Sequence, residues 1–316
     1  MARKLINTKE ISHDEWLALR KKSLGGSDAG TCVGMNQYSS LLTLYADKMG
    51  LSSPKEDNEA MRLGRDLEQY VADRFMEATG KKLVNDNFFY LDDEFDFISA
   101  NVDRKVVGEN AGFEAKTMGS FNGYDVEAGD LPSHYYAQCQ HYCMVRGWDR
   151  IYIGILVLQK GFYWHCIERD DAFIKTLRDA EIDFWTNYVQ RGRRPEPDGS
   201  DASMETLKEL YPEEKSIMAI MIPGLDALVR DYKAYKTMED EYHEKAEKAK
   251  GIICAKLGDH QEGIGSEFAC TWKVQNRTSL DTARLKAEMP DVYAEYSKTT
   301  PSRTFRTKKN KNKKGA

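Results

Sequence analysis

The stretch that decides the fold is FISANVDRKVVGENAGFEAKT, residues 97–117. Strand-like alternation flanks the turn GENAG (108–112), whose two glycines supply the bend of a hairpin. The hairpin brings Asp103, near the end of the first strand, beside Glu114 and Lys116 on the second. These last two share a face because residues two apart in a strand point the same way. Two carboxylates and an ammonium group are therefore expected on one patch.

Helical and strand-like patterns surround this hairpin. Apolar periodicity predicts helices at 13–23, 40–50, 59–79, 133–147 and 170–191. Strand-like runs lie at 81–91, 95–107, 112–117, 150–158 and 161–168. Strands bracketed by helices predict an α/β fold with a central mixed β-sheet flanked by helices.

A change in amino-acid composition and pattern divides the chain into two parts. The segment RPEPDGSDAS (194–203) is typical of a linker or surface crossing. It predicts a first domain over 1–197 and a mainly helical accessory region over 198–316. The accessory region is expected to contain charged helices at 219–228 and 232–257, a strand-like piece at 267–278 and a last helix at 280–298 capped near Asp281.

Composition places the chain among soluble globular proteins, with 41% hydrophobic and 31% charged residues over a length of 316. No apolar run approaches the roughly 18 residues of a membrane span, and the first residues lack a signal-peptide core. A cytoplasmic location without membrane association is expected. The six cysteines are scattered, and Cys139 and Cys143 are interpreted as buried thiols because no CxxC supplies further metal ligands.

The net charge of −5 argues against a general affinity for nucleic acid, but its distribution is uneven. The chain after Pro301 carries seven basic residues and no acid, which leaves −12 for the remainder: Arg303, Arg306, Lys308, Lys309, Lys311, Lys313 and Lys314. A basic tail on an acidic body favours DNA tethering through phosphate contacts. A solvated end is the alternative, and both interpretations stay open.

The patch at Asp103, Glu114 and Lys116 has the groups that phosphodiester cleavage requires. Carboxylates hold hard divalent cations such as magnesium, which activate water and stabilise phosphoryl charge. A neighbouring lysine orients the nucleophile or stabilises developing charge. Glu68 lies beside the apolar stripe of the 59–79 helix and adds a third candidate carboxylate; an ordinary ion-pairing acid is the other interpretation. The spacing alone is weak, because charged residues alternate on many exposed strands.

Four blocks in order carry a family resemblance: EWLALRKKSLGGSDAG (15–30), MRLGRDLEQYVADRF (61–75), SANVDRKVVGENAGFEAKT (99–117) and HYYAQCQHYCMVRGWDRIYIGIL (134–156). In them the chain resembles the YqaJ-type phage recombination nucleases of the PD-(D/E)xK superfamily, the group that contains lambda exonuclease. The resemblance implies a restriction-endonuclease-like core for the first domain. Val102 and Arg104 depart from the proline and glycine that flank the metal-binding aspartate in the family, so strand geometry and substrate grip there are in doubt.

The resemblance also implies the catalytic roles. Asp103, Glu114 and the main-chain carbonyl of Ala115 would be metal ligands, and Glu68 would hold a second metal or its waters. Lys116 would position the attacking water. Two Mg²⁺ ions per site are implied, with Mn²⁺ as a substitute.

The remaining implied residues support the site or grip DNA. Gln138 would support the metal site from a helix. Arg20 and Ser27 would hold a DNA phosphate at the 5′ end, with help from the backbone amides of Gly25 and Gly26. A plain helix cap preceded by a flexible turn is the other interpretation of GGSDAG.

The resulting hypothesis is a 5′-to-3′ exonuclease on linear double-stranded DNA ends that leaves 3′ single strands for a single-strand annealing protein. A homo-oligomer, by family analogy a trimeric ring, would explain processivity. Two alternatives stay open. One is a structure- or sequence-dependent endonuclease or nickase on the same core, and the other is an inactive DNA-binding scaffold. The accessory region carries no obvious catalytic set; Trp272 in it would stack on a base or pack in a strand.

Overall fold

The computed structural model describes residues 2–53, 57–121, 123–299 and 302–309. The chain separates into two compact units, Met1–Pro212 and Glu213–Ala316.

The first unit holds most of the regular structure. Its helices are η1 (Thr8–Glu10), α1 (His13–Lys21), α2 (Gly26–Cys32), α3 (Leu41–Lys48), α4 (Glu59–Thr79), α5 (Ser133–Arg146), α6 (Asp171–Phe184), η2 (Trp185–Val189) and α7 (Asp201–Leu210). Its strands are β1 (Arg3–Asn7), β2 (Leu83–Asn85), β3 (Phe88–Leu91), β4 (Ser99–Ala100), β5 (Arg104–Val106), β6 (Ala111–Met118), β7 (Arg150–Val157) and β8 (Gly161–Glu168).

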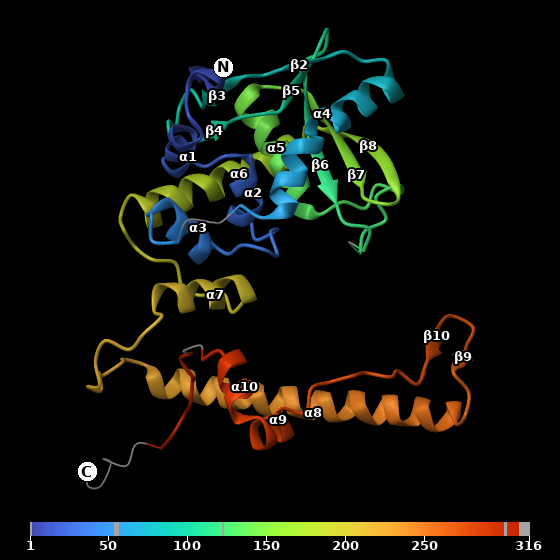
Figure 1. Cartoon of the computed structure of the whole chain (residues 1–316). Coiled ribbons are helices and arrows are strands. Elements are labelled where there is room, and N and C mark those ends of the chain that lie inside the picture. Colours follow the sequence, from blue (N-terminus) through green and yellow to red (C-terminus); the bar gives the residue numbers. More distant parts are fainter. Residues whose placement is uncertain (1, 54–56, 122, 300–301, 310–316) are drawn as a thin grey trace. The chain divides into compact units, whose positions relative to one another are not determined.

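A five-stranded sheet in the order β2-β5-β6-β7-β8 forms the centre of this unit (Figure 1). Strands β6 and β7 run parallel, and the other neighbours are antiparallel. The prediction of an α/β fold with a central mixed sheet is confirmed. The hairpin is also confirmed, since β5 and β6 pair with Arg104 opposite Phe113. A second sheet has the order β1-β3-β4.

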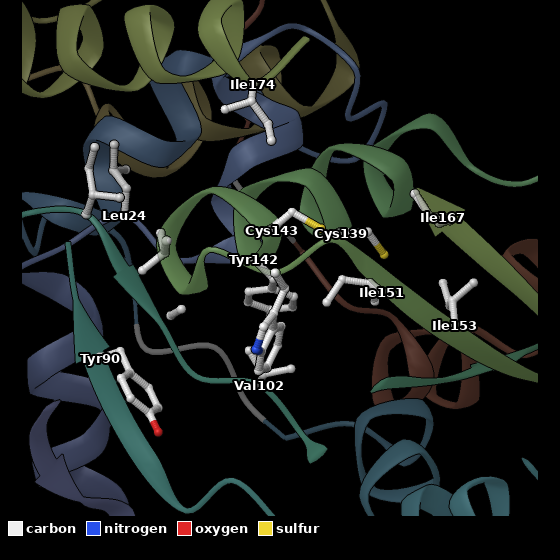
Figure 2. Packing of buried hydrophobic residues seen from close by; sticks show 14 of the residues in the cluster. Leu24, Tyr90, Val102, Cys139, Tyr142, Cys143, Ile151, Ile153, Ile167 and Ile174 are labelled. Carbon is white, nitrogen blue, oxygen red and sulfur yellow. The ribbon is translucent and has the colours of Figure 1, made fainter. Parts of the chain in front are cut away.

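Helices α4 and α5 cover opposite faces of the central sheet. On the α4 face, the rings of Phe75 and Phe113 lie 4.8 Å apart, and Tyr152 joins the same cluster. On the α5 face, the buried Cys139 and Cys143 pack with isoleucines of β7 (Figure 2). The interpretation of these two cysteines as buried thiols is confirmed.

Two glycines allow α2 to approach α5 closely. A Cβ on Gly26 would lie 2.6 Å from the ring of Tyr142, and a Cβ on Gly30 would lie 2.7 Å from the side chain of His134. Any larger residue would push the two helices apart. The GGSDAG run therefore has a packing role that its sequence pattern did not reveal.

The strand predictions need correction in two places. The run 81–91 is divided between β2 and β3, which belong to different sheets, and the run 95–107 is divided between β4 and β5. Alternation identifies extended backbone but does not show where a strand leaves one sheet for another.

The segment 194–203, interpreted as a linker, contains the start of α7. This helix packs on α3, where the hydroxyl oxygens of Thr43 and Thr206 lie 2.7 Å apart. The compact first unit therefore runs to Pro212, past the predicted domain limit at 197/198. That an accessory function begins at 198 stays a prediction.

The second unit is built around one 33-residue helix, α8 (Leu225–Leu257), where two helices were predicted. It also contains β9 (Glu262–Ile264), β10 (Ala269–Thr271), α9 (Thr282–Glu288) and α10 (Pro290–Tyr296). Asp281 caps α9 as predicted, but Pro290 begins a new helix inside the single one expected. Trp272 follows β10 and is 54% exposed.

Of the basic tail, Arg303, Arg306, Lys308 and Lys309 fall within the described residues, and Lys311, Lys313 and Lys314 lie outside them. Among the described residues, no helix combines the length and apolar character needed to cross a bilayer.

A substitution at Gly154 tests how tightly the central sheet packs against α4. A Cβ there would lie 2.8 Å from the Phe113 ring and 3.1 Å from Val71, between β7 and α4. We expect Gly154→Ala to lower the free energy of unfolding by about 1–3 kcal/mol, because overpacking strains a buried core. Urea unfolding of the full chain measures the effect. Gly64→Ala is the control, since nothing lies within 4 Å of that position; equal effects of the two variants would contradict the expectation.

Candidate active site

Glu114 and Lys116 lie on the α5 face of β6, as the two-residue spacing predicts. The Lys116 ammonium group donates to Glu114 Oε1 at 2.8 Å. Gln138 on α5 donates from Nε2 to the same oxygen at 2.7 Å. Glu114 is only 4% exposed, so its charge is held mainly by these two donors.

Asp103 reaches the same patch from the other strand of the hairpin. Pairing of β5 with β6 begins at Arg104, so Asp103 lies just ahead of the ladder. Its Oδ2 accepts a hydrogen bond from the backbone N–H of Ala115 at 2.9 Å. The side chain of Asp103 thus lies against the backbone between Glu114 and Lys116, as the hairpin argument predicts.

The charges in this cluster strongly perturb one another. Burial raises the pKa of Asp103 well above its ordinary value, and the carboxylates of Glu114 and Glu68 raise it further. Burial by itself lowers the pKa of Lys116, but Glu114 and Asp103 outweigh this and raise it. Lys116 is therefore a permanently charged cation in this cluster.

One oxygen of the cluster has no partner. Glu114 Oε2 is buried and lacks a hydrogen bond among the described residues. A buried carboxylate oxygen of this kind is costly unless a cation or a donor reaches it. Within the described part of the chain, no three His, Cys, Asp or Glu side chains gather as a metal site. The donor set that fits a cation is thus Glu114 and Asp103 with the Ala115 carbonyl, completed by water, as magnesium prefers.

Glu68 lies on α4, and its charge raises the pKa of Asp103. Glu68 itself is already paired with another side chain. The Arg104 guanidinium donates to Glu68 Oε1 at 2.5 Å and to Gln69 Oε1 at 2.9 Å. The Arg104 side chain is 6% exposed and that of Glu68 39%, so this pair is a partly buried link between β5 and α4. The sequence shows Arg104 as a departure from the family pattern but gives no partner for it.

Tyr142 is the residue of this site that sequence reasoning missed. Gln138 Nε2 also donates to the Tyr142 hydroxyl at 3.0 Å, and that hydroxyl donates to the Asn101 carbonyl at 3.3 Å. Tyr142 therefore fixes the Gln138 amide and the loop before Asp103 together. Its spacing of four from Gln138 on a helix is the signal that could have indicated the contact.

Arg20 and Ser27 come together as expected. Arg20 Nη2 donates to Ser27 Oγ at 2.5 Å, and the guanidinium lies 4.8 Å from the centre of the Trp16 ring. Trp16 in turn donates from Nε1 to Asn101 Oδ1 at 2.9 Å, which ties α1 to the loop before Asp103. Ser27 is exposed and Arg20 half-buried, so both remain accessible to a ligand.

The structure changes one part of the expected phosphate site, the backbone amide of Gly25. The Gly25 N–H donates to Asp28 Oδ2 at 3.0 Å, so this amide is already used. Asp28 also accepts from Lys48 at 2.7 Å, and despite burial its pKa is lowered by the charges of Lys48 and Arg20. Asp28 therefore anchors this corner, while Arg20 and Ser27 offer the accessible polar groups.

A pocket of about 600 Å³ lies next to this region. It is lined by the loop after α2, by Tyr124 between β6 and α5, and by His134 at the start of α5. Burial lowers the pKa of His134, and the charge of Lys116 lowers it further.

Comparison with known proteins identifies similar chains. Residues 15–149 match the YqaJ-like viral recombinase domain. The protein YqaJ of Bacillus subtilis strain 168 is 35% identical over 305 residues, which cover 95% of this chain and 96% of that protein.

Solved structures with a similar course of the chain include two exonucleases. The alkaline exonuclease LHK-Exo of Laribacter hongkongensis aligns at 19% identity with a TM-score of 0.47, over 57% of this chain and 97% of its own. A phage-related exonuclease of Haemophilus somnus 129PT aligns at 12% identity with a TM-score of 0.44, over 56% of this chain and 99% of its own.

The like-charge cluster predicts a pH-dependent cost in stability. A carboxyl group whose pKa is raised on folding contributes stability below its unfolded pKa of about 3.9, and this is lost as the pH rises through the folded value. In EDTA at pH 8 we therefore expect Asp103→Asn to unfold with a free energy higher by on the order of 1 kcal/mol, because the amide carries no charge. Urea unfolding from pH 4 to 8 measures the divergence from wild type.

The exposed Asp96→Asn is the matched control and should follow the wild-type curve. Adding Mg²⁺ should stabilise wild type and leave Asp103→Asn unchanged. Parallel pH curves for wild type and Asp103→Asn would show that the cluster carries no such repulsion.

Proposed function

The chain belongs to the YqaJ-like viral recombinase family, and on this basis we propose that it is a metal-dependent DNA exonuclease. It acts on linear double-stranded DNA from 5′ ends and leaves 3′ single strands for recombination by strand annealing. The observation that carries the proposal is the buried Glu114 oxygen without a partner, in a patch shared with Asp103 and Lys116.

The metal donors follow from the contacts. Asp103, Glu114 and the Ala115 carbonyl would hold Mg²⁺, with Mn²⁺ as a substitute, since all three offer hard oxygen ligands. A bound divalent cation supplies an activated water and neutralises phosphoryl charge. The hydrogen bonds that Lys116 and Gln138 donate to Glu114 would fix the carboxylate so that its free oxygen faces the cation.

Lys116 and Gln138 have separable tasks in this proposal. Lys116 stays protonated because Glu114 and Asp103 raise its pKa, so it acts as a fixed charge that orients water and stabilises the developing negative charge on phosphate. Gln138 donates to Glu114 and to Tyr142, and so it holds the ligand in place without touching substrate.

Arg20 and Ser27 would bind the terminal phosphate. Arginine offers a planar fork that matches phosphate oxygens, and stacking on Trp16 preorganises it. Trp16 is hydrogen-bonded to Asn101, and Asn101 to Tyr142. These bonds connect Arg20 and Ser27 to the loop before Asp103. A phosphate held there would set the position of the 5′ end relative to Asp103.

The assembly belongs to the same proposal. A single-strand annealing protein would receive the 3′ strands, and a homo-oligomer, by analogy a trimeric ring, would keep the enzyme on DNA. The second unit and the basic tail would add DNA or partner contacts. Action inside the cell, in the cytoplasm of a bacterial host, fits such a role.

Digestion of end-labelled linear DNA tests the proposal. With Mg²⁺, label should be lost from 5′ ends, and EDTA should stop the reaction. We expect Lys116→Ala to lower the rate by about 10²–10³-fold, because one preorganised charge at the phosphate is lost. The exposed Lys160→Ala is the matched control and should cut at the wild-type rate.

A closed circular duplex separates the remaining possibilities. Cutting of the circle would point to an endonuclease or nickase on the same site. Binding of DNA without cleavage under any divalent cation would point to an inactive scaffold, and the exonuclease proposal would be abandoned.

The phosphate grip gives a second test. Arg20→Ala should reduce the preference for 5′-phosphorylated over 5′-hydroxyl ends by about 10- to 100-fold, as expected for loss of a charge-assisted hydrogen bond. The neighbouring exposed Lys21→Ala should retain the preference. An unchanged ratio in Arg20→Ala would show that the 5′ phosphate is bound elsewhere.

A further inference from the structure

We infer that Arg104 takes the place of a second divalent cation beside Glu68, so that this site binds one metal ion. The inference rests on the proposed metal-dependent function and concerns the number of ions that the side chains admit. It changes the role of Glu68 from a metal ligand to the anchor of a built-in cation.

The contacts of Arg104 carry the argument. Its guanidinium donates to Glu68 Oε1 at 2.5 Å and to Gln69 Oε1 at 2.9 Å, so two neighbouring side chains of α4 fix it. Arg104 directly follows Asp103 in the chain, and its side chain reaches α4. The Arg104 side chain is 6% exposed and that of Glu68 39%.

Glu68 is the carboxylate that a second ion would need. Asp103 and Glu114 share the patch around the Ala115 amide, whereas Glu68 contacts Arg104. The guanidinium holds Glu68 Oε1, so a second ion at Glu68 would have to share this carboxylate with a fixed positive charge that repels it.

Charge balance points the same way. The patch contains three carboxylates, Glu68, Asp103 and Glu114, and two cationic side chains, Lys116 and Arg104. A second divalent ion would be opposed by the positive charges of Lys116 and Arg104.

Counting bound Mn²⁺ by electron paramagnetic resonance tests the inference without any DNA cleavage. Wild type should bind one ion. Arg104→Met, which keeps bulk but removes charge, should bind two, and Arg104→Met with Glu68→Gln should return to one. Arg104→Lys keeps the charge and should bind one. Arg65→Met removes an exposed arginine of α4 that pairs with Asp57, and it should also bind one.

Each measured ion count either supports the role of Arg104 or contradicts it. Two ions in wild type, or one ion in a folded Arg104→Met protein, would overturn the role of Arg104 while leaving the nuclease proposal intact. No ion in wild type would overturn both proposals. Circular dichroism and cooperative unfolding establish that each variant is folded. Arg104→Gln serves in place of Arg104→Met if that protein does not fold, with the same expected count of two.

Discussion

Two opposite charges on the buried face of β6 are the constraint on which the rest of the structure depends. Glu114 and Lys116 face α5, and a charge in such a place is tolerated only with nearby partners. The pair satisfies one carboxylate oxygen, and Gln138 adds a second donor to the same atom. The other oxygen stays without a partner. These contacts compensate the buried charge at one oxygen and leave Glu114 Oε2 for the proposed metal ion.

The same constraint fixes elements far along the chain. Gln138 is useful only if its amide is held, and Tyr142 holds it while bonding the Asn101 carbonyl. The Tyr142 ring in turn needs Gly26 beside it, because any Cβ there would clash. Gly26 precedes Ser27 on α2, so the packing that orients Gln138 and Glu114 also positions Ser27. The proposed metal ligand and the proposed phosphate contact are therefore held by one packing arrangement.

Sequence reasoning succeeded where a local pattern has one structural solution. The apolar stripe predicts α4 with both ends correct, and the glycine turn predicts the β5–β6 hairpin and the approach of Asp103 to Glu114. It failed where the answer is set by contacts distant in sequence. Alternation over 81–91 does not reveal a change of sheet, and proline and glycine near α7 concealed a helix that Thr43 stabilises.

Lys116 and Arg104, the two cationic side chains near the site, differ in chemistry in a way that residue spacing cannot show. Lysine is a compact charge with three donors, so Lys116 can donate to Glu114 and would keep donors for the proposed water or phosphate oxygen. Arginine is a planar fork that stays charged, so Arg104, bonded to Glu68 and Gln69, is suited to a permanent position. Its partners lie 36 and 35 residues away, and only the packing of α4 against the hairpin brings them together. In the proposed one-metal site, Lys116 would act on the phosphate, and Arg104 would take the place of the second metal ion.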